Sequence, residues 1–93
     1  MSMTRSNRKD FRNIRRRASG QLFGMFMRKA REARGFSVEE VAERMGIEAS
    51  DWLAIEAGAI PHPEWLPVIA DGLDIGLDQI GVSIRICRDA WDL

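Results

Sequence analysis

The stretch from Ser37 to Gly58, SVEEVAERMGIEASDWLAIEAG, restricts most strongly what this chain can fold into. Ser37 is a favourable helix N-cap, and Glu40 three residues later completes a capping box. Gly46 offers the left-handed backbone conformation with which a chain leaves a helix. A second apolar segment follows and ends at Gly58. The stretch therefore predicts two short helices joined by a tight turn.

The 93 residues are enough for one domain with a modest core, and they contain one cysteine and one histidine. Cys87 has no partner for an internal disulfide, and His62 cannot form a metal cluster with it. We therefore expect no metal and no cofactor. Because His62 stands between two prolines, we expect it in a loop or at a helix cap.

An enzyme is not expected, because neither Cys87 nor any other nucleophile has a base placed beside it in the sequence. Gly20 and Gly24 are not followed by the Lys-Ser/Thr of a phosphate-binding loop. No apolar run approaches membrane-spanning length, and the first ten residues lack the apolar core of a secretory signal. We expect the protein in the cytoplasm.

A net charge of zero conceals a strong asymmetry along the chain. Residues 1–36 hold eleven of the fourteen Lys and Arg and two acidic residues, whereas residues 37–93 hold three basic and twelve acidic residues. The two parts therefore carry about +9 and −9. This polarity favours a basic arm that meets an anionic partner or folds back on its own acidic body.

Residues 1–18 are predicted to be a basic, flexible arm. The simplest interpretation is a solubilising tail. Phe11, Ile14 and Ala18 nevertheless have near-helical spacing, so part of the arm can become a helix on a partner.

Residues 19–80 are predicted to be the helical domain. Ser19-Gly20 is expected to interrupt helical structure, so that a first helix runs from about Gln21 to Arg34. The fourth helix is expected to start near Glu64, because Pro67 fits only a first turn. A further short helical turn is predicted over residues 77–80.

The C-terminal extension, residues 81–93, changes period. Val82, Ile84 and Ile86 alternate with more polar residues, which favours a β-strand, although a run this short is also compatible with a helix. A single strand has no partner in a helical domain. We therefore expect it to pair with a second copy in a homodimer, or to cover the core.

Several short motifs occur in order between residues 27 and 80. They are Arg28 to Ser37, Glu39-Glu40-Val41-Ala42, Gly46-Ile47, Ile55-Glu56-x-Gly58 with Pro61, and Ile69-Ala70-x-x-Leu73. In this set and order the chain resembles the Cro/C1-type, or XRE-like, helix-turn-helix family of phage and bacterial transcriptional regulators. The resemblance implies an all-α, compact five-helix bundle whose second and third helices form the helix-turn-helix.

The resemblance also implies a structural ion pair between Arg31 of the first helix and Glu56, which ends the recognition helix. The alternative is two independent surface charges. Breaking an ion pair near the core would be strongly destabilising, because removal of one side chain leaves the other as a poorly solvated charge.

In this family the third helix lies in the major groove and the second crosses the DNA backbone. By position, the resemblance implies DNA-facing residues at Glu48, Ala49, Ser50, Leu53, Ala54 and Ala57. Val38 stands where a polar residue usually touches phosphate, so Ser37 and the backbone amides at that helix start remain for the contact. The third helix lacks the Arg, Lys, Asn and Gln side chains that usually read base edges. Its carboxylates would also approach phosphates unfavourably.

Two functions follow. In the first, the protein is a homodimeric transcriptional regulator of double-stranded DNA. Its phosphate contacts would come from Arg15, Arg16, Arg17, Arg28 and Lys29, and its specificity from Ser50, from apolar contacts and from DNA shape. In the second, the third helix binds a protein partner, and the arm gives only non-specific nucleic-acid binding.

Overall fold

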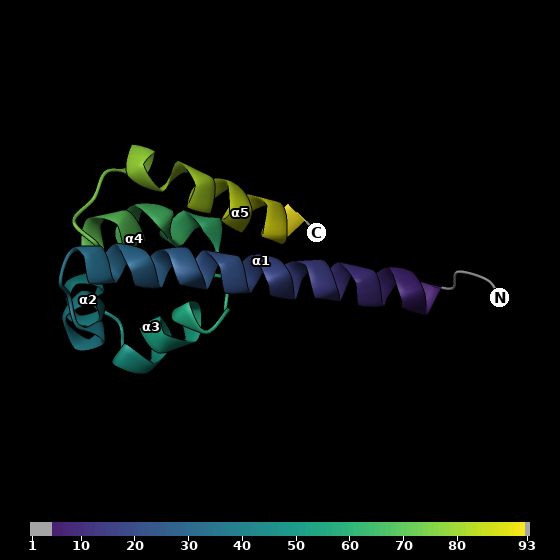
Figure 1. Cartoon of the computed structure of the whole chain (residues 1–93), viewed down its shortest axis with the longest axis horizontal. Coiled ribbons are helices and arrows are strands. Elements are labelled where there is room, and N and C mark those ends of the chain that lie inside the picture. Colours follow the sequence, from purple (N-terminus) through teal and green to yellow (C-terminus); the bar gives the residue numbers. More distant parts are fainter. Residues whose placement is uncertain (1–4, 93) are drawn as a thin grey trace.

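The structure, a computed structural model, describes residues 5–92. Its elements are α1 (Arg5–Ala33), α2 (Val38–Met45), α3 (Ala49–Glu56), the 3₁₀ turn η1 (Pro63–Trp65), α4 (Leu66–Gly72), the 3₁₀ turn η2 (Leu77–Ile80) and α5 (Gly81–Asp92). Every regular element within residues 5–92 is helical, which confirms the predicted all-α fold with five helices. In Figure 1, α3 and α5 pack on opposite sides of the long α1.

The helix-turn-helix of α2 and α3 forms as its local sequence predicts. The backbone N–H of Glu40 donates to Ser37 Oγ at 3.0 Å, and the N–H of Ser37 donates to Glu40 Oε1 at 2.9 Å, so the capping box is complete. Gly46 ends α2 in the left-handed conformation, with φ of 72°. The turn is therefore determined by short-range chemistry.

We predict that Ser37→Ala lowers the free energy of unfolding by about 1 kcal/mol, since it removes the side-chain acceptor at the start of α2. Urea denaturation followed by circular dichroism measures this. Ser50→Ala, at an exposed position on α3, is the control and should stay within about 0.5 kcal/mol of the wild type. Equal effects of the two substitutions would contradict the assigned cap.

The core gathers side chains from all five helices. Trp52 of α3 is fully buried, and so are Phe23 and Met27 of α1. The buried face of α4 and of the residue that follows it consists of Leu66, Ile69, Ala70 and Leu73, which are each at most 3% exposed. Burial of these large side chains is the main force that holds the helices together.

Two glycines let α3 approach α1 closely. A Cβ added at Gly24 would lie 2.5 Å from the carbonyl oxygen of Glu56 and 2.6 Å from that of Ile55. One added at Gly20 would collide with the carbonyl oxygen of Gly58. The backbone of α1 therefore contacts the backbone at the end of α3 directly.

The start of α1 differs from the prediction. The helix begins at Arg5 instead of Gln21, and Ser19-Gly20 does not break it. Gly20 is present because of the close packing against Gly58, not because the chain turns there. The predicted flexible arm is thus helical from residue 5, and its residues 1–4 lie outside the described residues.

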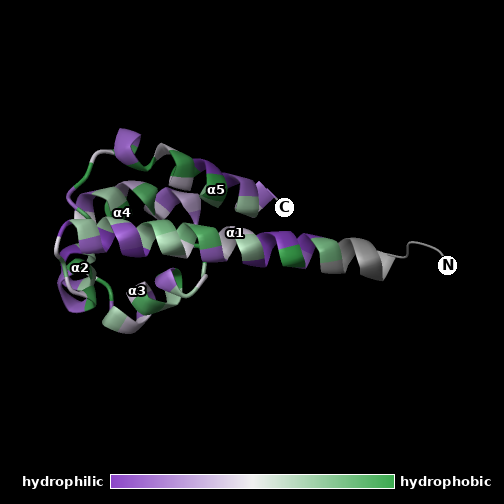
Figure 2. Ribbon diagram, viewed as in Figure 1, coloured by the Kyte–Doolittle hydropathy of each residue, from purple (hydrophilic) through white to green (hydrophobic). Residues whose placement is uncertain are grey.

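Because α1 has 29 residues, it is about 43 Å long, and its first half projects beyond the other helices (Figure 1). The side chains of residues 11–18 are exposed. Figure 2 shows hydrophobic positions interspersed with hydrophilic ones along the coloured part of this projecting half.

The strand favoured for the C-terminal extension is wrong and the helical alternative is confirmed, because residues 81–92 form α5; residue 93 lies outside the described residues. Ser83, Cys87 and Ala90 are buried and recur at spacings of four and three, so they form one helical face. The alternation of apolar and polar residues over 82–87 is short enough to fit either a strand or a helix, and packing against α1 favours the helix. Pairing of two C-terminal strands therefore no longer accounts for a dimer.

The connection after α3 is fixed to α5. The Trp91 indole N–H donates to the carbonyl oxygen of Pro61 at 2.8 Å, and the Cys87 thiol donates to the same oxygen at 3.2 Å. His62 accepts from the N–H of Glu64 at 3.2 Å and caps η1, which confirms its predicted role. The 3₁₀ turn η1 covers the predicted start near Glu64, and α4 itself begins at Leu66.

Candidate nucleic-acid interface

The outward face of α3 is the surface that would meet a partner. Its exposed residues are Glu48, Ser50, Asp51, Leu53, Ala54 and Ala57. Leu53 is 51% exposed and is the one large apolar side chain among these residues. Val38 and Ala49 are half-buried against the core, so they are less available than the other predicted positions.

The helix-turn-helix carries several exposed carboxylates. They come from Glu39, Glu40 and Glu43 of α2 and from Glu48 and Asp51 at the start of α3. Arg44, the one cation between Ser37 and Gly58, is turned toward α4. Its Nε donates to the carbonyl oxygen of Gly72 at 2.7 Å, and its guanidinium lies over the Phe36 ring at 4.9 Å. The field at the helix-turn-helix therefore disfavours phosphate.

The N-terminal end of α2 is also unfavourable for phosphate. The hydrogen bond from the backbone N–H of Ser37, and then its hydroxyl, lower the pKa of Glu40, so that this carboxylate stays charged to a lower pH than an ordinary glutamate. A negative charge there offsets the positive end of the α2 dipole. A phosphate contact at Ser37 and Val38 is thereby weakened.

The structure contains the Arg31–Glu56 ion pair, with Nε 2.6 Å from Oε2 and Nη2 3.3 Å from Oε1. The two side chains are 13% and 10% exposed. Trp52 donates its indole N–H to Glu56, and Arg31 donates to the carbonyl oxygen of Phe36 at 2.9 Å. The hydrogen bond with Glu56 raises the pKa of Arg31. This cation fixes the end of α3 to α1 and is not available to a ligand.

The cations predicted to contact phosphate are exposed and lie on α1. Arg15, Arg16 and Arg17 are exposed on the projecting half, and the Arg16 guanidinium lies 5.1 Å from the centroid of the Trp91 ring. Lys29 is exposed near the other end, and Arg28 is 65% exposed beside Glu32, with Nε 3.3 Å from Oε2. The predicted phosphate-binding cations are therefore spread along one helix.

Of the three arginines, Arg17 continues the α3 side of α1. It precedes Gly24 by seven residues, which is about two helical turns, so both lie on nearly the same face. Gly24 contacts the C-terminal end of α3. Arg17 is therefore about 10 Å beyond that end along the α1 axis, whereas Arg15 and Arg16 point to other sides.

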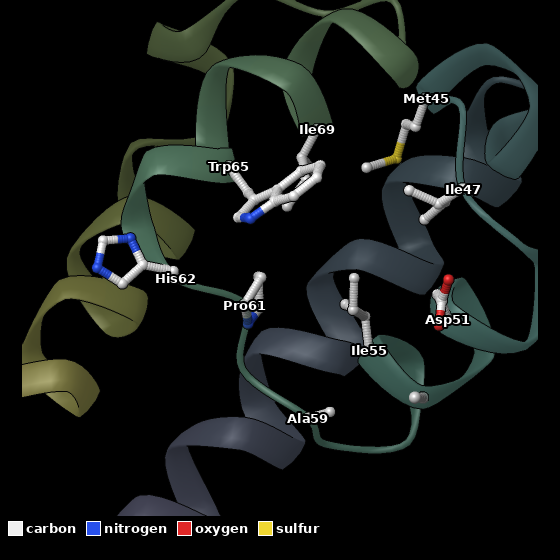
Figure 3. A pocket seen from close by; sticks show the side chains of 10 residues that line it. Met45, Ile47, Asp51, Ile55, Ala59, Pro61, His62, Trp65 and Ile69 are labelled. Carbon is white, nitrogen blue, oxygen red and sulfur yellow. The ribbon is translucent and has the colours of Figure 1, made fainter.

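Sequence reasoning missed an apolar groove of about 360 Å³ behind α3. Figure 3 shows Met45, Ile47, Ile55, Trp65 and Ile69 around it. Asp51 and Ala54 of α3 also line it, so Ala54 borders this groove as well as the outer face. The walls come from α2, α3, η1 and α4 and from the connection after α3, which are brought together only by the tertiary fold.

Comparison with known proteins gives one family. A family model described as "Helix-turn-helix domain" matches residues 22–81, from the second half of α1 to the start of α5. No curated protein and no solved structure matches the chain. In the part of the chain that the structure describes, no helix is long and apolar enough to cross a membrane.

Proposed function

The chain belongs to the helix-turn-helix domain family, of the Cro/C1 type, and we propose that it is a sequence-specific DNA-binding transcriptional regulator that acts as a homodimer in the cytoplasm. The observation that carries this proposal is a recognition helix held rigidly from one side and exposed on the other. The Arg31–Glu56 pair and the close contact at Gly24 hold α3, while Ser50 and Leu53 face outward.

Affinity and specificity would come from different elements. Exposed arginines of α1 neutralise phosphates, and each such contact makes binding depend on salt. On α3, the Ser50 hydroxyl reaches base edges, Leu53 and Ala54 meet thymine methyl groups, and Glu48 accepts from cytosine N4. The small side chains of α3 also let its backbone approach the groove, where the shape of the DNA adds specificity.

A second candidate function has an observation of its own. The exposed Leu53, the neighbouring alanines and the surrounding carboxylates resemble a surface that docks on protein more than one that meets phosphate. In this case α3 binds a partner protein, and α1 contributes only non-specific attraction to nucleic acid.

Selection of bound sequences from a random duplex library, with the full-length protein, tests the two functions. The regulator predicts an enriched palindrome, with half-sites about one DNA turn apart. Absence of any enriched sequence, with binding that depends only on α1 arginines, would contradict the regulator and favour the protein-docking function.

We further predict that substitutions on α1 and on α3 change DNA binding in different ways. On the selected duplex, Arg17→Gln should weaken binding to all sequences and reduce the slope of log K against log salt by about 1, because Arg17 lies on the α3 side of α1. The double substitution Ser50→Ala and Leu53→Ala should reduce the ratio of specific to non-specific affinity by about 10-fold or more. Arg85→Gln, at an exposed position on α5, is the charge control. Fluorescence anisotropy at several salt concentrations gives all three results.

A further inference from the structure

The projecting helix carries an exposed apolar stripe. It consists of Phe11, Ile14, Ala18, Leu22 and Met25, here named the outer stripe. Phe11 and Ile14 are each 65% exposed, and Leu22 and Met25 are each 41% exposed. At 3.6 residues per turn, these residues lie on the side of α1 away from the buried Phe23 and Met27. No other helix described here covers this side, so the stripe is available to a partner.

The intervals between residues of the outer stripe are the same whether they are counted from the N-terminal or from the C-terminal end. From Phe11 to Met25 the steps are three, four, four and three residues, with Ala18 at the centre. A second copy running antiparallel therefore matches the stripe position for position. Its smallest residue lies at the midpoint, where two crossing helices approach most closely.

The charges along α1 select the orientation of such a pair. Residues 11–17 hold Arg12, Arg15, Arg16 and Arg17 and no acidic residue, whereas residues 18–27 hold no charged residue at all. A parallel pair would place one arginine-rich segment against the other. An antiparallel pair places each arginine-rich segment against an uncharged one, so most of the repulsion is avoided.

We propose that the outer stripe is an antiparallel seam between two copies of this chain. Phe11 packs against the partner's Met25, Ile14 against the partner's Leu22, and Ala18 against the partner's Ala18. The seam is about 21 Å long and leaves α3 of each copy uncovered. It specifies the interface of the homodimer proposed above and does not depend on DNA binding.

The size of the seam sets its strength. Five side chains from each copy bury less than the roughly 1,200 Å² at which stable interfaces begin. The dimer is therefore expected to dissociate in the micromolar range, not the nanomolar range. A closely spaced pair of operator half-sites would then raise the local concentration of the two copies.

Sedimentation equilibrium of the full-length protein without DNA tests the seam. Ile14→Asp should raise the dimer dissociation constant by about 100-fold or more, because each dimer buries two copies of the new charge. Val82→Asp is the matched control, since Val82 is also 65% exposed but lies on α5, and it should leave the constant unchanged. Circular dichroism establishes that both variants fold.

Cysteine crosslinking then tests the register. Cys87 is retained because it is fully buried and burial raises the pKa of its thiol, so it resists oxidation. Ala18→Cys alone should crosslink to itself under oxidation. Phe11→Cys alone should not, whereas a mixture of Phe11→Cys and Met25→Cys proteins should.

Each other outcome overturns the proposal in a distinguishable way. Self-crosslinking of the Phe11→Cys protein would show a parallel pair. A dimer that Ile14→Asp does not weaken would overturn the seam and leave the homodimer to another surface. A monomeric wild type at 200 µM would overturn both, and the DNA-binding part of the proposed function would be unaffected, since its test is separate.

Discussion

Gly24→Ala is expected to lower the free energy of unfolding by about 3 kcal/mol or to abolish folding. The new Cβ would lie 2.5 Å from the carbonyl oxygen of Glu56 and 2.6 Å from that of Ile55. Both atoms belong to the backbone of α3, so no flexible side chain can move aside. The helices must separate, and the core around Trp52 then loses contacts.

Gly81→Ala is the matched control for this glycine. Gly81 begins α5, and an added Cβ there would meet nothing within 4 Å. Alanine should therefore leave stability unchanged or raise it by up to about 1 kcal/mol, through its better helix propensity. Urea denaturation of both variants gives the comparison. If Gly24→Ala behaved like Gly81→Ala, α1 and α3 would not be in backbone contact.

The helix-turn-helix could be predicted from sequence because its determinants are local. Ser37 and Glu40 are three residues apart, and Gly46 follows α2 directly. Caps and turns of this kind require no information from the rest of the fold. The resemblance added what spacing alone could not, namely which third-helix positions face outward and that Arg31 meets Glu56.

The two wrong element predictions arose where local and tertiary preferences differ. Gly20 was interpreted as a helix break, but in the structure it permits contact with Gly58, 38 positions later. Residues 82–87 fit a strand period as well as a helix period, and packing of Cys87 and Ala90 decided between them. A six-residue stretch of sequence does not reveal which of its side chains will be buried against α1.

The acidic character of the helix-turn-helix could be predicted from its composition, but the partners of Arg44 and Arg34 could not. Arg44 lies among acidic residues and Arg34 ends a basic segment, yet each is bound to the end of α4. Arg44 contacts Gly72, and Arg34 contacts Asp74 with Nη2 2.9 Å from Oδ2. These bonds span 28 and 40 residues. They leave the helix-turn-helix acidic, and the cations that we propose as DNA contacts all lie on α1.

Glu56→Ala is expected to lower the free energy of unfolding by about 3–5 kcal/mol. The substitution leaves the Arg31 guanidinium, 13% exposed, without its carboxylate, and the buried Trp52 indole without its acceptor. Each loss is a desolvated polar group left without its partner, which is why the effect exceeds that of a surface pair. In a domain of this size the midpoint of thermal unfolding should fall by more than 10 °C.

Two further variants separate the ion pair from other effects. Glu39→Ala removes an exposed carboxylate from α2 and should change stability by less than about 0.5 kcal/mol. Arg31→Met combined with Glu56→Ala removes the stranded charge, so the double variant should be more stable than Glu56→Ala alone. Because Glu56 ends α3, the single variant should also weaken specific DNA binding more than non-specific binding. An unchanged unfolding midpoint for Glu56→Ala would show that α3 is held by apolar packing alone.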